Sequence, residues 1–244
     1  MFAEPDLATS SRFFHLVWRS FLRAAPVLPD EGMGVLPRQL ADRLDAGTVR
    51  LAEPVAEVRP HAVVTASGER LRARAVVVAT DGATAATLVP GLAAPEWNGL
   101  TTFYYRTGTP PLDLPVITID ARRGPVVNTA VLSAVAPGYA PREQALICAT
   151  TLGTDTSESA VRDHLTRLYR TSTANWELVA AYPIPHALPR MSPPHALRRP
   201  VRLEPGLYVC GDHRDTSSIQ GALVSGRRTG RSVVTDLAGV ATAS

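Results

Sequence analysis

Short apolar runs separated by turn residues follow one another from residue 49 to residue 80. The runs at residues 61–66 and 69–74 are predicted to form a hairpin around Ser67 and Gly68. The run at 75–80 is almost continuously apolar, which is typical of a buried strand. The expected strands of this region cover residues 49–51, 54–58, 61–66, 69–74 and 75–80.

A second pattern occupies residues 82–200. The helix expected at 157–169 has Val161 and Leu165 on one face and charged residues on the other. The proline-rich run at 182–189 excludes a helix or a central strand. Helical periodicity also predicts a helix at residues 10–25. The expected strands of this region cover residues 101–106, 116–119, 126–132, 145–150 and 176–182.

The C-terminal pattern is the most specific. Residues 205–212 form a short apolar strand that ends in Gly211-Asp212, and a helix opens on Gly221-Ala222 after a polar loop. A carboxylate at a strand end can accept hydrogen bonds from sugar-like hydroxyls, and free N–H groups at a helix N-terminus can face a phosphate or an electronegative edge. Small residues at 222, 226 and 230 share one helix face, which predicts close approach by a backbone or a flat ring.

Composition predicts a folded protein of one or two domains. The chain has 244 residues, of which 45% are hydrophobic and 19% charged. The formal net charge of +3 is too small to argue for a nucleic-acid partner. All 25 basic residues are Arg, so a Schiff-base lysine is excluded on this chain.

The two cysteines, Cys148 and Cys210, lie in apolar strand patterns without metal-ligand spacing. They are interpreted as buried, inert thiols in a reducing compartment. The first residues lack the basic and apolar regions of a signal peptide, and no run of 18 apolar residues exists for a membrane span. A cytoplasmic location is expected by elimination.

The strand, Gly-Asp, loop and Gly-Ala helix together resemble the C-terminal flavin-binding motif of the FAD-dependent amine oxidase and phytoene desaturase superfamily. Residues 32–41 look like the Gly-Gly-Met-x-x-Leu-Pro segment of that family, with Glu31 in place of the first glycine. The strand order at 49–80 is similar to its β-meander. An ordinary strand–loop–helix corner of an α/β protein is the alternative interpretation.

The resemblance implies FAD as the cofactor. It places the Asp212 carboxylate at the ribityl hydroxyls, the Val55 backbone at the adenine, and Ala79 and Thr80 near the cofactor; for Val55, a plain strand residue is the alternative. The implied cofactor-binding residues are Val55, Ala79, Thr80, Gly211, Asp212, Ile219, Gln220, Gly221 and Ala222.

One expected unit is missing. Such flavoproteins begin with a strand, Gly-x-Gly-x-x-Gly, a helix, and an acidic residue roughly 20 positions further on. Here Gly32 and Gly34 follow no strand, and Pro37 stands at the third glycine position. The resemblance therefore covers nearly the whole chain but only the C-terminal half of a typical member.

The predicted fold is mixed α/β: an incomplete FAD/NAD(P)-binding Rossmann-like domain with a β-meander, interleaved with a substrate domain made of an antiparallel sheet plus helices. The cofactor-binding part is expected at 26–81 and 201–244, and the substrate part at 1–25 and 82–200.

Catalytic residues are not identifiable, because in this superfamily the flavin N5 accepts the hydride and the protein supplies orientation. His213 lies beside Asp212 and Asp215, which is compatible with metal ligation, although a polar loop near the isoalloxazine is the preferred interpretation and no metal is expected. His186 and His195, between prolines, are interpreted as surface residues or the lining of a substrate entrance.

Three functions remain open. The chain is a flavin-dependent oxidoreductase half completed by a separate N-terminal half, a non-enzymatic module that binds an apolar ligand or a partner without FAD, or a truncated product without function. The substrate is expected to be a small molecule, and an amine, a polyene or a porphyrin-like ring would each suit the superfamily. The expected macromolecular partner is an N-terminal-half polypeptide or a second copy of the chain.

Overall fold

The computed structural model describes residues 2–120 and 124–242. The chain forms two compact units, each assembled from separate segments. Unit 1 comprises Met1–Leu7, Arg19–Val49 and Asn98–Ala187, and unit 2 comprises Ala8–Trp18, Arg50–Trp97 and Leu188–Ser244. The division into a cofactor-binding and a substrate part remains a prediction.

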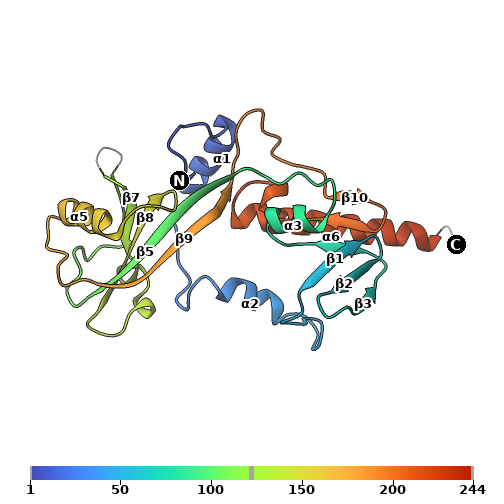
Figure 1. Ribbon diagram of the computed structural model, residues 1–244, viewed down its shortest axis with the longest axis horizontal. Coiled ribbons are helices and arrows are strands. Elements are labelled where there is room, and N and C mark those ends of the chain that lie inside the picture. The colour runs from blue at the N-terminus through green and yellow to red at the C-terminus, as the bar shows by residue number, and fades with distance from the viewer. Residues whose placement is uncertain (1, 121–123, 243–244) are drawn as a thin grey trace. The chain divides into compact units, whose positions relative to one another are not determined.

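Unit 1 is built on a five-stranded sheet in the order β6-β7-β8-β5-β9. The β6–β7, β7–β8 and β8–β5 pairs are antiparallel. Figure 1 shows the long strands β5 and β9 side by side. The strands are β5 (Trp97–Thr107), β6 (Ile117–Ile119), β7 (Val126–Val131), β8 (Ala145–Leu152) and β9 (Glu177–Pro189). All five predicted strands of this region are therefore confirmed.

One face of this sheet packs against helix α5 (Glu158–Tyr169). Along β8, every second residue is buried, which is the pattern of a strand with one covered face. Val161 and Leu165 of α5 are fully buried in the same cluster, together with Tyr105 and Trp176. Ser157 caps the helix by accepting a hydrogen bond from the Ala160 N–H. Helix α4 (Leu132–Val135) and the 3₁₀ turn η1 (Pro137–Tyr139) connect β7 to β8.

The closing strand extends further than the sequence pattern indicates. We expect a strand only to residue 182, but β9 continues through Pro183 and Pro185 to Pro189. The prolines are tolerated because β9 is an edge strand, where a missing N–H faces away from the sheet. The Arg106–Glu177 ion pair joins β5 to β9 at one end, and the Cβ position of Gly99 lies 3.3 Å from the Pro185 carbonyl at the other.

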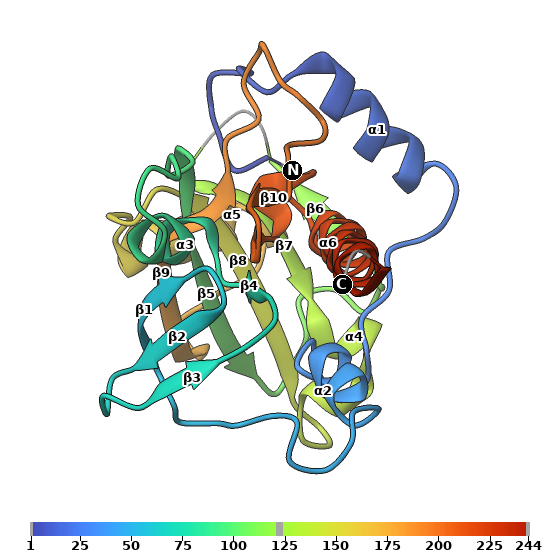
Figure 2. The same cartoon turned by 90° about the vertical axis from the view of Figure 1, so that its right-hand side faces the viewer.

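Unit 2 contains the predicted meander. Strands β1 (Val55–Arg59), β2 (Ala62–Thr65) and β3 (Arg70–Arg72) form a three-stranded antiparallel sheet, whose strands are labelled in Figure 2. The turn between β2 and β3 uses Gly68 at φ +87°, where glycine is favoured. The strand predicted at residues 49–51 is wrong: Leu51 is 85% exposed, and no strand among the described residues pairs with this segment.

A second small sheet of unit 2 has the order β10-β11-β4. Strand β4 (Val76–Val78) is parallel to β11 (Leu207–Val209), whereas β10 (Arg202–Glu204) is antiparallel to it. Helix α3 (Gly82–Leu88) follows β4 directly. Apolar residues of this sheet, of α3 and of β1 share one core: Val58, Val76, Val78, Ala85, Val89, Leu207 and Val209.

Helix α6 (Ile219–Thr242) runs along this sheet (Figure 1). Its packing is fixed by the hydrogen bond from the Tyr208 hydroxyl to Asp236 and by the ion pair of Asp236 with Arg202. Among the described residues, no helix combines the length and apolarity that crossing a membrane requires.

Two further helices lie near the start of the chain. Helix α1 (Ser11–Phe21) confirms the helix predicted at 10–25 and ends four residues earlier. Helix α2 (Val35–Ala41) coincides with the second half of the Gly-Met segment. Its side chains are mostly exposed, including Leu36 and Leu40.

Candidate cofactor-binding site

The site is built where β4 and β11 end. Because the two strands are parallel neighbours, with Val78 opposite Val209, their carboxyl ends meet at one sheet edge. The Cys210 N–H donates to the Val78 carbonyl at 2.9 Å and extends the pairing by one residue. The Thr80 carbonyl lies 3.4 Å from the Cβ position of Gly211. The structure therefore places Ala79-Thr80 and Gly211-Asp212 side by side, and their role in cofactor binding stays a prediction.

Gly211 has a backbone conformation that only glycine adopts readily, with φ +148°. A Cβ at this position would lie 2.6 Å from the His213 ring. The Ser225 hydroxyl of α6 holds both polar groups of Gly211. It accepts from the Gly211 N–H at 2.9 Å and lies 2.7 Å from the Gly211 carbonyl. Ser225 therefore fixes the backbone immediately before Asp212.

Asp81 and Asp212 follow the two parallel strands. Asp81 caps α3, where its carboxylate accepts from the Ala83 N–H at 2.9 Å and the Thr84 N–H at 3.0 Å. Burial raises the pKa of Asp212, and the Asp81 charge raises it further, while the backbone N–H groups of His213 and Asp212 act in the opposite direction. Asp212 is half-buried, so its carboxylate remains accessible to a ligand hydroxyl.

His213 fills the space between two glycines. Its ring lies 3.0 Å from the Cβ position of Gly82 and 2.6 Å from that of Gly211, and the residue is 3% exposed. Burial lowers the pKa of His213 to about 4; the positive charges of Arg214 and Arg199 lower it further, and Asp81 opposes them. The imidazole is therefore neutral at pH 7. Within the described ranges, neither ring nitrogen has a hydrogen-bond partner.

Asp215 belongs to a separate, buried charge network. Arg228 of α6 donates to the Asp215 carboxylate at 2.8 Å and to the Arg199 carbonyl at 2.7 Å. Arg214 bonds the Pro200 carbonyl. Arg228 therefore joins α6 to two loops: to the loop before β10 through the Arg199 carbonyl, and to the loop after β11 through the Asp215 carboxylate. In residues 2–120 and 124–242, no three His, Cys, Asp or Glu side chains form a metal-binding group.

The start of α6 presents free donors. Ser218 caps the helix by accepting from the Gly221 N–H at 3.0 Å. The N–H groups of Ile219 and Gln220, both exposed, have no acceptor in the described part of the chain. The helix therefore begins two residues before Gly221, and the first turn has two N–H groups available for an electronegative ligand atom.

The buried face of α6 is not the small-residue face at 222, 226 and 230, for which close approach by a backbone or a flat ring stays a prediction. Ala222, Gly226 and Gly230 do share a face, but Ala222 and Gly230 are exposed. The buried stripe is instead Gly221, Ser225 and Thr229, also at four-residue spacing. A Cβ at Gly221 would lie 1.8 Å from the Thr216 carbonyl, so glycine is required there by the preceding loop. The four-residue spacing of Ser225 and Thr229 from Gly221 is the sequence pattern that could have identified Ser225 and Thr229 as buried residues.

The other predicted residues lie at the margins of this arrangement. Val55 begins β1, is 37% exposed and pairs with Thr65 in the meander. Its strand reaches the common core through Val58. Burial raises the pKa of the Cys210 thiol, in agreement with an inert thiol at the end of β11.

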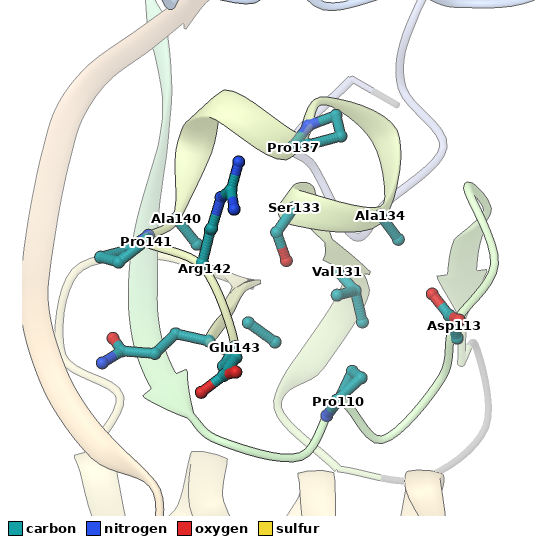
Figure 3. Close-up of a pocket in the computed structure, with 12 residues that line it drawn as sticks. Pro110, Asp113, Val131, Ser133, Ala134, Pro137, Ala140, Pro141, Arg142 and Glu143 are labelled. Carbon is teal, nitrogen blue, oxygen red and sulfur yellow. The ribbon is translucent and has the colours of Figure 1, made fainter.

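Unit 1 has a cavity of about 260 Å³ between α4 and the segment before β8. Figure 3 shows the Arg142 side chain and the Ser133 hydroxyl entering it from different walls, with Asp113 on the opposite side. Glu143 adds a second carboxylate to the lining. The lining thus has both charge signs and favours no single class of ion.

The parallel strand pair, the long helix α6 and the meander belong to a mixed α/β fold with several sheets. The chain belongs to the family of flavin-containing amine oxidoreductases, whose sequence profile matches residues 1–234. This confirms the family indicated by the sequence motifs. The family points to a flavin cofactor. No curated protein shows significant similarity to the sequence.

Solved structures show the same fold at low sequence identity. Reduced UDP-galactopyranose mutase superposes with a TM-score of 0.59 and 11% identity over 79% of this chain and 52% of that chain. PF1083 protein from Pyrococcus furiosus superposes with a TM-score of 0.54 and 12% identity over 74% of this chain and 46% of that chain. An oxidoreductase from Methanosarcina mazei superposes with a TM-score of 0.51 and 12% identity over 73% of this chain and 48% of that chain. The chain therefore spans about half the length of each of these structures.

Proposed function

We propose that the chain forms the flavin-side half of an FAD-dependent oxidoreductase of the amine oxidase or desaturase type. One observation carries the proposal: the Ser225 hydroxyl holds Gly211 on both sides, so that the accessible Asp212 carboxylate stands at the sheet edge beside the start of α6. A carboxylate that follows a fixed backbone at a strand end, together with free N–H groups at the start of the next helix, suits a ligand that combines hydroxyls with an electronegative ring or phosphate.

In this proposal, Asp212 accepts hydrogen bonds from ribityl hydroxyls. The free N–H groups of Ile219 and Gln220 face the electronegative edge of the flavin, beside Gly221 and Ala222. Ala79, Thr80 and Gly211 form the adjoining wall, and the Val55 backbone meets the adenine. Bound FAD supplies the hydride acceptor. The protein orients the ring and excludes water.

The proposal includes a partner that supplies the pyrophosphate-binding unit. The chain has no Gly-x-Gly-x-x-Gly segment following a strand. Strand β4 is at the edge of its sheet, and Val77 in its middle is 41% exposed. An unpaired edge of this kind accepts a further strand. We infer that a separately encoded or contiguous N-terminal half pairs there.

The chain alone should bind FAD weakly. It lacks the pyrophosphate loop and the ribose carboxylate, and each lost charge-assisted hydrogen bond is worth about 1.5–3 kcal/mol. The visible absorbance of the purified chain, titrated with FAD, measures this. A yellow, flavin-saturated protein purified from this chain alone would contradict the requirement for a second half.

The site itself is tested in the presence of an N-terminal half. Asp212→Ala should weaken flavin binding roughly tenfold to hundredfold, because a hydrogen bond to a charged group is lost. Glu204→Ala is the matched control, since Glu204 is an exposed carboxylate on β10. Asp215→Ala is unsuitable as a control because Asp215 is paired with Arg228. Equal flavin content in both variants would sink this assignment, and a complex that never takes up flavin would favour the non-enzymatic binding module.

A further inference from the structure

His213 is a buried polar side chain to which the fold gives space but no hydrogen-bond partner. The residue is 3% exposed, and both ring nitrogens, Nδ1 and Nε2, lack a partner among the described residues. The ring occupies the niche between Gly82 and Gly211, whose Cβ positions lie 3.0 Å and 2.6 Å from it. A buried polar group without a partner indicates a bond that forms in another state of the protein.

The protonation state of the ring limits what this bond can be. Burial and the positive charges of Arg214 and Arg199 lower the pKa of His213 to about 4, against the opposing charge of Asp81. At pH 7 the imidazole is therefore neutral, with one N–H donor and one acceptor nitrogen. The buried N–H is costly to leave without an acceptor, so a group that can accept from it has to be within reach.

Asp212 offers an acceptor just beyond bonding distance. Its Oδ1 atom lies 3.9 Å from Nδ1 of His213, which is about 1 Å longer than an N–H···O hydrogen bond. Asp81, the carboxylate whose charge also acts on the ring, is already engaged. It accepts from the N–H groups of Ala83 and Thr84 and from the Thr84 hydroxyl. Asp212 is therefore the carboxylate to which the Nδ1–H group can donate.

The Asp212 side chain can close this distance by itself. The backbone before it is fixed, because the Ser225 hydroxyl accepts from the Gly211 N–H and bonds the Gly211 carbonyl. The His213 ring is confined by the two glycines. The half-buried Asp212 side chain, in contrast, reaches the surface and can turn about its own bonds. A rotation that brings Oδ1 to Nδ1 leaves Oδ2 able to accept from a ligand hydroxyl.

We propose that His213 is a positioning residue for Asp212: its neutral imidazole donates from Nδ1 to the Asp212 carboxylate and holds that carboxylate ionised and oriented for a ligand hydroxyl. A hydrogen bond to a carboxylate favours its charged form, so this bond counteracts burial and the Asp81 charge, which raise the pKa of Asp212. The ring acts through Asp212 and does not touch the ligand. Its role toward a flavin rests on the proposed function, whereas the bond between the two side chains does not.

Two substitutions separate this bond from simple packing. Asparagine places an amide N–H close to the position of Nδ1, whereas glutamine places one close to the position of Nε2. His213→Gln should therefore make Asp212 titrate at a higher pH than in the parent chain, and His213→Asn should restore the parent titration. Carbon-13 NMR of the Asp212 carboxyl group measures this. The Asp215 carboxyl group, which is paired with Arg228, is the internal control and should titrate alike in all three chains.

The position of the ring proton is a second, independent measurement. Nitrogen-15 NMR of the parent chain at pH 7 should find the proton of His213 on Nδ1. Circular dichroism would establish that both variants keep their helices. A ring proton on Nε2, or an Asp212 titration that is the same in His213→Gln as in the parent chain, would overturn the proposal. Equal shifts in His213→Gln and His213→Asn would also overturn it, because packing alone would then explain them.

Flavin mononucleotide, which has the ring and the ribityl chain without the adenosine part, is the probe for the ligand. Fluorescence titration should show roughly tenfold weaker binding in His213→Gln and recovery in His213→Asn, because the Asp212 carboxylate loses and regains its orientation. Weaker binding in Asp212→Ala without any change in His213→Gln would keep the flavin site and overturn the positioning role. Equal binding by the parent and Asp212→Ala chains would count against the proposed flavin site, while the shifted titration of Asp212 in His213→Gln would still confirm the bond.

Discussion

His213 shows how burial of a single side chain sets a pH response. Its pKa in the folded chain is about 4, against about 6.5 for an ordinary histidine. The unfolded chain binds a proton first as the pH falls, so stability is lost between pH 6.5 and 4. This shift corresponds to roughly 3 kcal/mol. The raised pKa of Asp212 acts in the opposite direction and reduces the net loss.

We therefore predict that His213→Gln flattens the acid side of the stability curve. The free energy of unfolding, measured by urea denaturation from pH 7 to pH 4, should fall less steeply in the variant than in the parent chain. His15→Gln, at an exposed position on α1, is the control and should keep the parent slope. An unchanged slope in His213→Gln would show that the imidazole is not buried in solution.

Ser225 is the residue on which the position of Gly211 depends. Ser225→Ala leaves the Gly211 N–H without its acceptor at 2.9 Å. The expected loss is about 1–3 kcal/mol of unfolding free energy, with faster hydrogen exchange at the Gly211 amide. Ser232→Ala, a half-buried serine of the same helix, serves as the control. Full protection of the Gly211 amide from hydrogen exchange in Ser225→Ala would show that the Ser225 hydroxyl does not hold the Gly211 backbone.

At the scale of the helix, two glycines of α6 have opposite roles. A Cβ at Gly221 would lie 1.8 Å from the Thr216 carbonyl, whereas a Cβ at Gly226 meets nothing within 4 Å. Gly221→Ala should therefore displace the loop before the helix and destabilise the chain. Gly226→Ala should stabilise it by about 0.5–1 kcal/mol, because alanine lowers the entropy cost of helix formation.

Thermal unfolding of the two variants measures this difference. The two substitutions add the same methyl group to the same helix, so helix propensity is matched and only the surroundings differ. A higher Tm for Gly221→Ala would mean that the loop at Thr216 leaves room for a methyl group in solution. Gly221 would then be free for the close ring approach that the sequence pattern predicts.

At the scale of the whole molecule, unit 2 exposes apolar side chains on strand β4 and helix α6. Val77, Leu223 and Val224 are each more than 40% exposed. Surfaces of this kind usually mark an interface. We predict that the chain alone self-associates at high concentration and binds an apolar dye, and that an N-terminal half suppresses both effects.

Light scattering measures the self-association of two variants and so tests whether the apolar surface of unit 2 is the interface. Val77→Asp places a charge on the open edge strand β4 and should reduce self-association. Ile119→Asp, at a position 71% exposed on β6 of unit 1, should have little effect. A parent chain that remains a monomer at every concentration, without dye binding, would rule out this interface.

Local patterns determined most of the secondary structure. The apolar run at 145–150 predicts β8, the turn at Ser67-Gly68 predicts the β2–β3 hairpin, and a glycine after an apolar run marks the end of β11. These features depend on residues close in sequence. The flavin-oxidoreductase family was equally readable, because its motifs are contiguous segments.

The tertiary structure decided what depends on distant partners. Leu51 has no strand to pair with in the part of the chain that the structure describes, and Pro183 lies in a strand only because β9 is at a sheet edge. Helical spacing alone could not decide whether residues 222, 226 and 230 or residues 221, 225 and 229 form the buried face of α6, since both sets repeat every four residues. The contact of Gly221 with Thr216 and the bonds of Ser225 to Gly211 select the second set. Hydrophobic period fixes the local element, whereas burial, pKa and hydrogen-bond partner are properties of the three-dimensional neighbourhood, which no local pattern contains.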